Sequence, residues 1–380
     1  MICAFRYRLY PTRKQLVSLD LMLDGHRFLY NQALAQRKDV YEKTGKGIGY
    51  NTQATNLLPQ LRTESVIVSA CNYSSLQQTL RRLDKAFKAF FRRAKTGEKP
   101  GYPRFKSADR FNTINYAALG DGCQIKSDRL YLQNIGHVKV KWHRPLEGKT
   151  KTLCVSRRNG KWYACFFVEH DIVTLPVSGK SIGIDVGLNS FITTSEGHQI
   201  DAPKYFRASE KHLKSAQQRL SRRKKGAKRR AKARKLVSGI HEKIANQRLD
   251  FCHKTAKKIV DAYSHIAVEN LSIRNMVKNP HLAKSISDAG WGMFLTILKS
   301  KAEKAGRGFE EVNPQGTSQR CSVCGEVVKK SLAVRVHRCP SCGLSLDRDV
   351  NAALNILQLA RTGPSALATM SVVPPRSRLL

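Results

Sequence analysis

Three acidic residues stand in apolar surroundings in a chain that has few acids. The 380 residues include 28 Asp and Glu against 68 Lys and Arg, a formal net charge of +40. Asp185 lies inside the run SIGIDVG, Glu269 follows HIAV, and Asp349 opens DVNAALNIL. A carboxylate in an apolar strand is costly unless it is paired or binds a metal ion. Because Mg²⁺ prefers carboxylate oxygens, the three acids are candidates for a divalent-metal centre.

Taken one at a time, each acid also has a structural explanation. Asp185 would satisfy a turn, Glu269 would pair with one of the many Lys or Arg residues, and Asp349 or Asp347 would cap a helix. In the order strand Asp, strand-end Glu and helix Asp, they instead form the metal-binding pattern of the ribonuclease H-like fold. Two Mg²⁺ ions, or Mn²⁺, held by such acids activate water and neutralise charge in phosphodiester hydrolysis. We therefore predict Asp185, Glu269 and Asp349 as catalytic metal ligands.

Four of the ten cysteines form two Cys-x-x-Cys pairs, Cys321 with Cys324 and Cys339 with Cys342, separated by fourteen residues. A glycine follows each pair directly and lets the backbone fold around the second sulfur. Four thiolates suit one tetrahedral Zn²⁺ and leave no open position for a catalytic water. The alternative is two disulfides or free thiols, which a reducing compartment disfavours. We predict one structural Zn²⁺, with His337 as a nearby surface residue.

The basic excess extends from the first fifty residues to past Arg335 and predicts a polyanionic partner. No apolar run approaches the roughly 20 residues that span a bilayer, and the start, MICAFRYRLYPT, lacks the pattern of a signal peptide. Nucleic acid is the expected partner, with no membrane contact, and the cysteine usage indicates a reducing cytoplasm. The remaining cysteines are interpreted as core or surface thiols: Cys3, Cys71, Cys123, Cys154, Cys165 and Cys252.

The elements that precede the first acid are helices and then strands. Pro11-Thr12 opens a helical region that continues to about residue 93, and Gly97 with Pro100 closes it. Residues 111 to 178 alternate β-branched and aromatic residues, with a turn at 158–160. The opening CAFRYRLY is also strand-like, so the helices are expected to be an insertion into a β domain. The clearest helical stripe, at steps of four and three, is Leu76, Leu80, Leu83, Phe87 and Phe90.

The elements around the acids alternate between strands and helices. Asp185 lies in a predicted β-hairpin, a helix is predicted up to Tyr263, and HIAVENLSI is a short buried strand. One helix is predicted over SISDAGWGMFLTILKSKAEKAG, and a last one from about Arg348 to Ala360. The chain beyond Thr362 is rich in Ser, Pro and Arg and is expected to be disordered.

Two basic segments are candidate nucleic-acid contacts. Between Lys204 and Lys235 the only acid is Glu210, and so many like charges repel one another unless a polyanion lies against them. Residues 101–107, GYPRFKS, interleave aromatics with cations, which suits stacking on a strand; a loop anchored by two aromatic plugs is the alternative. The candidate contacts are Tyr102, Arg104, Lys106, Arg222, Arg223, Lys224, Lys225, Arg229 and Arg230.

The sequence resembles the TnpB family, nucleases encoded beside transposases in prokaryotic insertion sequences and related to the type V CRISPR nucleases. The resemblance rests on YRLYPTRKQ, GYPRFKS, GIDVGLNSF, VENLSIRNM, NPQGTSQRCSVCG and CGLSLDRDVNAALNIL, in this order over nearly the whole chain. It implies that the three acids of the RuvC-like site are Asp185, Glu269 and Asp349. The family's third acid precedes x-Asn-Ala-Ala, so Asp347 is expected to be a cap or an outer-shell residue.

The resemblance implies an α/β fold plus a β-barrel. A β-barrel wedge domain would comprise residues 1–10 and 111–178, interrupted by a helical recognition domain at 11–110. A RuvC-like, ribonuclease H-like nuclease domain would comprise residues 179–316 and 346–361, with a zinc ribbon inserted at 317–345. Residues 362–380 would form the disordered tail.

The function implied is that of an RNA-guided DNA endonuclease of a transposable element. A guide RNA derived from the transposon end would pair with one strand of double-stranded DNA, while the protein reads a short flanking motif. The companion transposase would be a functional partner. Two alternatives use the same features: a transposase that joins strands, and a catalytically silent nucleic-acid-binding repressor. Composition and spacing alone support a metal-dependent nucleic-acid enzyme.

Overall fold

The chain forms two compact units, Met1–Asp171 and the part from Ile172 onward. The computed structural model describes residues 1–171, 174–331 and 333–362. Residues 363–380 of the expected tail lie outside this description. Leu175 and Pro176 are hydrogen-bonded within the second unit: the Leu175 amide donates to the Ala305 carbonyl, and Arg307 donates to the Pro176 carbonyl.

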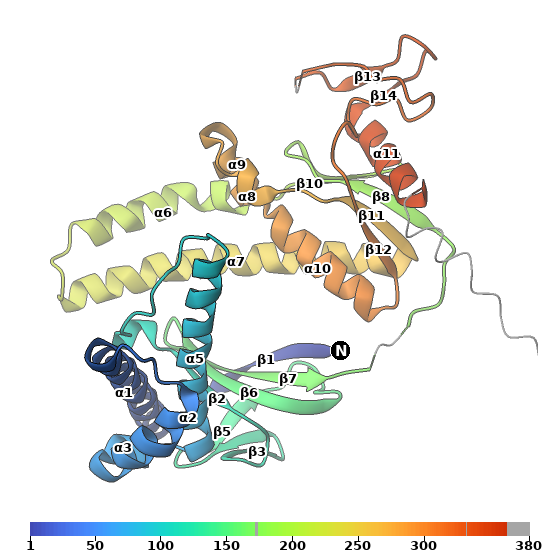
Figure 1. Ribbon diagram of the computed structural model, residues 1–380. Helices are drawn as coiled ribbons and strands as arrows, with labels where there is room; N and C mark the ends of the chain where they lie inside the picture. Colours follow the sequence, from blue (N-terminus) through green and yellow to red (C-terminus); the bar gives the residue numbers. More distant parts are fainter. Residues whose placement is uncertain (172–173, 332, 363–380) are drawn as a thin grey trace, which may run out of the picture. The chain divides into compact units, whose positions relative to one another are not determined.

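The first unit is an antiparallel sheet with a helical insertion after its first strand (Figure 1). Its elements are β1 (Ile2–Tyr10), α1 (Arg13–Thr44), α2 (Tyr50–Thr52), the π-helical η1 (Gln53–Leu57), α3 (Leu58–Glu64), α4 (Val66–Ser69), α5 (Tyr73–Lys95), the 3-10 turn η2 (Ala108–Arg110), β2 (Thr113–Tyr116), β3 (Cys123–Lys126), β4 (Arg129–Leu132), β5 (Gly136–Lys141), β6 (Lys149–Arg158) and β7 (Lys161–Glu169).

Strand β1 lies inside the sheet, whose order is β2-β6-β7-β1-β5-β4-β3. Residues 1–171 are all described, and in them β2 and β3 are edge strands that do not pair with each other, so the sheet is an open half-barrel. Asn159 and Gly160 join β6 to β7 with φ of 50° and 71°. Positive φ at both positions is typical of a two-residue type I′ turn, as the sequence predicts.

The helical stripe of α5 packs against α1 and the sheet in one continuous core. Leu76, Leu80 and Leu83 are fully buried, while Phe87 packs against the edge of this core. Thr12 begins α1 through a reciprocal pair of hydrogen bonds with Gln15, which confirms the predicted helix start.

The second unit is built on a five-stranded mixed sheet. Its elements are β8 (Ser181–Asp185), β9 (Ser190–Thr194), β10 (Gln199–Asp201), α6 (Tyr205–Ser221), α7 (Lys228–Ala262), β11 (His265–Glu269), α8 (Ile273–Met276), α9 (Pro280–Ala289), α10 (Trp291–Lys304), β12 (Gly308–Val312), β13 (Val336–Arg338), β14 (Ser345–Asp347) and α11 (Arg348–Thr362). The strand order is β10-β9-β8-β11-β12, with β8, β11 and β12 parallel to one another.

The single helix predicted between residues 285 and 306 is two helices. Gly290 has φ 74°, caps α9 and begins α10, because a left-handed residue ends a helix and glycine adopts it without a Cβ penalty. The predicted buried stripe of α10 is confirmed: Trp291, Phe294, Leu298 and Ala302 all lie in the core.

Helix α11 crosses β8 at Gly183, in close contact. A Cβ atom at residue 183 would lie 2.1 Å from the Ala353 carbonyl oxygen and 2.9 Å from the Leu357 Cβ. Any side chain at this position would push α11 away from the sheet. Gly183 therefore sets the distance between β8 and α11, the two elements that carry Asp185 and Asp349.

None of the helices in the described ranges combines the length and the hydropathy that a bilayer crossing requires.

Candidate metal centres

Asp185 and Glu269 lie at the same edge of the second sheet. Asp185 ends β8 and Glu269 ends β11, the parallel neighbour in which Val268 is opposite Ile184. The carboxyl ends of parallel strands meet at one edge, so the next residue of each strand brings the two acids together there. The flanking residues Ile182, Ile184 and Ile266 are buried and hold the strands in the core.

Asp349 reaches this edge from the first turn of α11. Its Oδ2 lies 3.9 Å from the position that a Cβ of Gly187 would occupy, just beyond β8. Asp347 accepts hydrogen bonds from the amides of Asp349 and Val350 at 2.9 and 3.1 Å. Asp347 is therefore the cap of α11, as the sequence suggested, and its carboxylate oxygen Oδ1 is engaged with the helix.

All three acids have a raised pKa, and burial is the largest cause for each. Burial, and then the negative charges of Glu269 and Asp349, hold the pKa of Asp185 well above its usual value. Burial also raises the pKa of Glu269, against a lowering by its hydrogen bond from Thr317. Burial and then Asp347 raise the pKa of Asp349, although Arg335 and Arg348 oppose this. A divalent cation relieves such repulsion between buried carboxylates, so the donor set fits Mg²⁺ or Mn²⁺.

The acids converge less tightly than the cysteines. In the described ranges, the four cysteines are the one group of His, Cys, Asp and Glu residues whose potential ligand atoms all lie within 4.8 Å of one another. Among the residues that the structure describes, Arg335 forms an ion pair with the acid cluster: its Nη1 lies 3.7 Å from Asp349 Oδ2. With its amide oxygen turned toward Arg335, Asn189 accepts hydrogen bonds of 3.0 and 3.1 Å from the same guanidinium.

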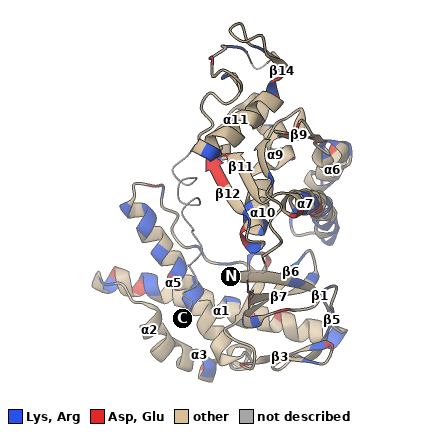
Figure 2. Ribbon diagram, turned by 90° about the vertical axis from the view of Figure 1, so that its right-hand side faces the viewer, with Lys and Arg blue, Asp and Glu red and all other residues tan. Residues whose placement is uncertain are grey.

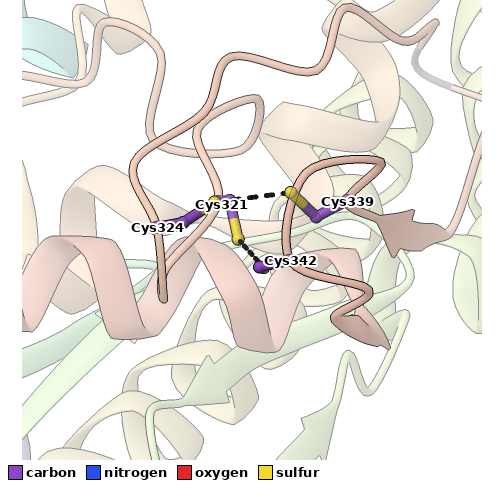
Figure 3. Close-up of side chains that lie close together, drawn as sticks. All are labelled: Cys321, Cys324, Cys339 and Cys342. Carbon is purple, nitrogen blue, oxygen red and sulfur yellow. Dashed lines mark hydrogen bonds between the residues drawn. The ribbon is translucent and has the colours of Figure 1, made fainter.

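The cysteine cluster is formed by two matching turns (Figure 3). Cys321 Sγ lies 3.6 Å from Cys342 Sγ, and Cys324 Sγ lies 3.5 Å from Cys339 Sγ. In both turns the glycine after the second cysteine donates its amide to the first cysteine's carbonyl, and φ is 80° at residue 325 and 73° at residue 343. Although burial opposes it, hydrogen bonds from backbone amides and His337 hold the pKa of Cys321 at about 6. The cluster thus fits a tetrahedral thiophilic ion.

His337 is buried, not at the surface as the sequence suggested. It is 0% exposed, and its Nδ1 is in contact with the Lys330 Nζ. His337 lies in β13 opposite Leu346, and its ring faces inward beside Cys321. In the sequence, only the closeness of His337 to Cys339 was visible, and this spacing did not reveal that the His337 side chain is buried.

The structure gives the candidate nucleic-acid residues different surroundings. Tyr102 is half-exposed and packs edge-on against Phe87 and Phe90, with ring centroids 5.6 and 5.3 Å apart. The Lys106 backbone amide and carbonyl both bond to the Asn31 side chain, at 2.8 and 3.0 Å. The 101–107 loop is therefore anchored as well as exposed, and Arg104 extends from it into solvent.

The basic run forms the hairpin between α6 and α7. Arg230 donates to the carbonyls of Leu220 and Arg223 at 2.9 and 2.6 Å and so closes the end of α6. Arg222, Lys224, Lys225 and Arg229 are exposed at this turn, where Arg223 and Arg229 line a hollow together with Arg219 and Lys232. Among the described residues, no Asp or Glu lines this hollow.

Three residues of the site escaped the sequence analysis: Thr317, which donates a 2.5 Å hydrogen bond to Glu269, Arg335, and Asn189. Thr317 lies in the segment GTSQRC directly before the first cysteine pair, so its position was visible but its partner was not.

Together, the sheet, the acids at its edge and the cysteine pairs define an α/β protein with two candidate metal centres. Family models described as "Probable transposase", "Cas12f1-like, TNB domain" and "Helix-turn-helix domain" match residues 165–280, 291–356 and 1–46. Residues 1–46 fold as β1 and the unbroken helix α1, with no turn between two helices in this fully described segment.

Curated relatives match nearly the whole chain. A "Putative RNA-guided DNA endonuclease" of Streptomyces pristinaespiralis is 35% identical, over 93% of this chain and 88% of its own. A "Putative RNA-guided DNA endonuclease InsQ" of Escherichia coli K12 is 30% identical, over 93% and 91%. The solved structure of the mini-RNA-guided endonuclease CRISPR-Cas_phi3 shares the fold, with a TM-score of 0.51, 9% identity and coverage of 95% and 92%. The chain belongs to the TnpB family.

The raised pKa of Asp185 predicts a pH-dependent stability. The folded state binds this proton more tightly than the unfolded chain, so stability present at low pH is lost as the pH rises through the raised pKa. Asp185→Asn removes the buried charge. In buffer without added divalent ions its melting temperature should exceed that of the wild type at about pH 8 and converge with it near pH 4.

The matched control is Asp39→Asn, an exposed acid of α1, which should leave the melting temperature unchanged at both pH values. If Asp185→Asn melts below the wild type at about pH 8, the acids do not repel one another as described.

Overall, the cysteine geometry predicts one zinc ion per chain. Elemental analysis of the purified protein should find it, and Cys339→Ser with Cys342→Ser should abolish it and lower the melting temperature, because zinc binding contributes folding free energy. Cys154→Ser with Cys165→Ser, outside the cluster, should retain the ion. Zinc-free wild-type protein with intact thiols would contradict this assignment.

Proposed function

We propose that the protein is an RNA-guided DNA endonuclease of a transposable element. The observation that carries the proposal is the convergence of Asp185, Glu269 and Asp349 at one edge of the sheet in a chain with a net charge of +40. Such a charge binds a nucleic-acid backbone, and buried acids are where a nuclease needs its metal ions. The names of the two curated relatives support the guided activity.

The fold of the second unit is proposed to be RuvC-like, of the ribonuclease H-like class. Across the sheet the strand order is β10-β9-β8-β11-β12, so the third, second, first, fourth and fifth strands of the chain segment lie side by side. Asp185 is on the first of these strands, Glu269 is on the fourth, and Asp349 is on α11. This placement of the acids on two strands and a helix supports the proposal. The nuclease domain would comprise residues 179–316 and 346–361, with a zinc ribbon at 317–345 whose four cysteines hold structural Zn²⁺.

The first unit would bind nucleic acid as a wedge sheet with a helical recognition insertion. The insertion at 11–110 carries Tyr102, Arg104 and Lys106, and Lys and Arg recur along α5 (Figure 2). In the second unit the cations at the α6–α7 turn would contact phosphates. A guide RNA from the transposon end would then select double-stranded DNA beside a short flanking motif, and the companion transposase would act on the same element.

The chemistry would be hydrolysis of a phosphodiester. Two Mg²⁺ ions, or Mn²⁺, supply activation of water and charge neutralisation when bound. Asp185, whose pKa the charges of both other acids raise, would contact both ions, while Glu269 and Asp349 would each hold one of them. The side chain of Arg335, beside Asp349 and 48% exposed, adds positive charge where an anionic substrate would approach.

A second candidate is a transposase, which the description of the model matching residues 165–280 favours. Strand-joined products formed without RNA would identify it. A catalytically silent repressor would bind nucleic acid and leave it uncut with any divalent ion.

Asp185→Ala should abolish cutting while leaving binding intact. Removing the shared ligand costs several kcal/mol of transition-state stabilisation, so guided cleavage of a plasmid in Mg²⁺ should fall by at least roughly a thousandfold. Affinity for RNA and target DNA, measured by filter binding, should stay within about twofold because the basic surfaces are untouched.

The matched control is Asp261→Ala, an exposed acid paired with Lys257 on α7, which should cut like the wild type. An Asp185→Ala protein that cuts at the wild-type rate refutes the assignment of the three acids.

A further inference from the structure

Glu269 has one hydrogen-bond donor to its side chain in the described residues. Thr317 Oγ1 lies 2.5 Å from Glu269 Oε1, and Thr317 is 5% exposed. The same hydroxyl lies 3.2 Å from the Pro314 carbonyl. A hydroxyl has only one proton to donate. The Glu269 carboxylate is the stronger acceptor of the two and lies closer than the Pro314 carbonyl, so it receives that proton. The hydroxyl therefore fixes which way the Glu269 oxygens face.

Thr317 is itself held by helix α11. Asn355 Nδ2 donates to the Thr317 carbonyl at 2.8 Å and to the Arg320 carbonyl at 2.7 Å. Asn355 is 3% exposed, so its amide has been withdrawn from water to make these bonds. Asp349 lies on the same helix, so two of the three acids depend on one rigid element.

The first cysteine turn is attached to the same face of α11. Asn351 accepts from the Ser322 amide at 3.0 Å and donates to the Arg320 carbonyl at 2.8 Å, and Gln358 donates to the Ser322 carbonyl at 2.8 Å. Positions 351, 355 and 358 recur at helical spacing and form one polar stripe. This stripe binds the segment from Thr317 to Ser322.

We infer that Thr317 is a positioning residue for the divalent-metal centre, held in place by the Asn355 side chain, which together with Asn351 also attaches the first cysteine turn. The cysteine cluster and the acid cluster then form a single hydrogen-bonded assembly through residues 317–322. Outer-shell donors of this kind orient a ligating carboxylate, and their loss typically weakens metal binding roughly 10- to 100-fold. The inference rests on the proposed metal-dependent nuclease function.

The test is a titration of the purified full-length protein with Mn²⁺, in which electron paramagnetic resonance measures the concentration of the free ion. Subtracting the titration of Asp185→Asn leaves the ions bound at the acid cluster. Thr317→Val keeps the shape of the side chain and removes the hydroxyl, and it should weaken this binding by roughly tenfold. Thr317→Ser keeps the hydroxyl and should bind within about twofold of the wild type.

Two controls separate positioning from folding. Thr296→Val removes an exposed hydroxyl of α10 that bonds to its own helix, and it should bind Mn²⁺ like the wild type. Zinc content should remain one ion per chain in every Thr317 variant, which shows that the cysteine cluster is intact. If Thr317→Val does not fold, Thr317→Ala compared with Thr317→Ser repeats the deletion of the hydroxyl.

Three results would overturn the inference. Equal Mn²⁺ affinity in the wild type and Thr317→Val means that the hydroxyl orients nothing. Weak binding by Thr317→Ser with normal binding by Thr317→Val means that the methyl group, through packing, is what matters. Wild-type protein with no Asp185-dependent Mn²⁺ site removes the metal centre itself, so the proposed function fails and the inference with it.

Discussion

Helix α11 brings Asp349 to the edge of the second sheet because β8 presents a glycine where the helix crosses it. The Ala353 carbonyl occupies the space that a side chain at position 183 would need. This contact sets the position of the helix, and the helix then places Asp349 beside the strand-borne acids and its amide stripe beside the first cysteine turn. Both candidate metal centres therefore depend on one close approach of helix to strand.

The acid cluster is an electrostatic exception in the molecule. Most of the chain is basic, yet three carboxylates meet at one edge with Arg335 as their ion-pair partner in the described residues. Burial, and then the charges of Glu269 and Asp349, raise the pKa of Asp185, and a divalent cation at this edge would offset both effects. A basic surface that attracts a polyanion and an acidic edge that attracts metal ions together suit a nuclease.

The sequence predicted the parts of the structure that depend on local pattern. The apolar runs around Asp185 and Glu269 identified buried strands, and the four cysteines identified their own cluster, because spacing along the chain determines geometry there. The prediction of one helix across Gly290 was wrong, because the sequence shows the glycine but not that it adopts the left-handed conformation that ends α9. The roles of Thr317 and Arg335 were invisible, because their partners lie 48 and 14 residues away.

The measurement that tests the guided function most directly is to express the protein with its native flanking transposon sequence, purify it and sequence the bound RNA. We expect one discrete RNA species with a constant segment from the transposon end and a variable 3′ segment that directs cleavage. A heterogeneous mixture of cellular RNA, or none, would contradict the guided function and leave a basic metal-binding protein that acts on nucleic acid without a guide.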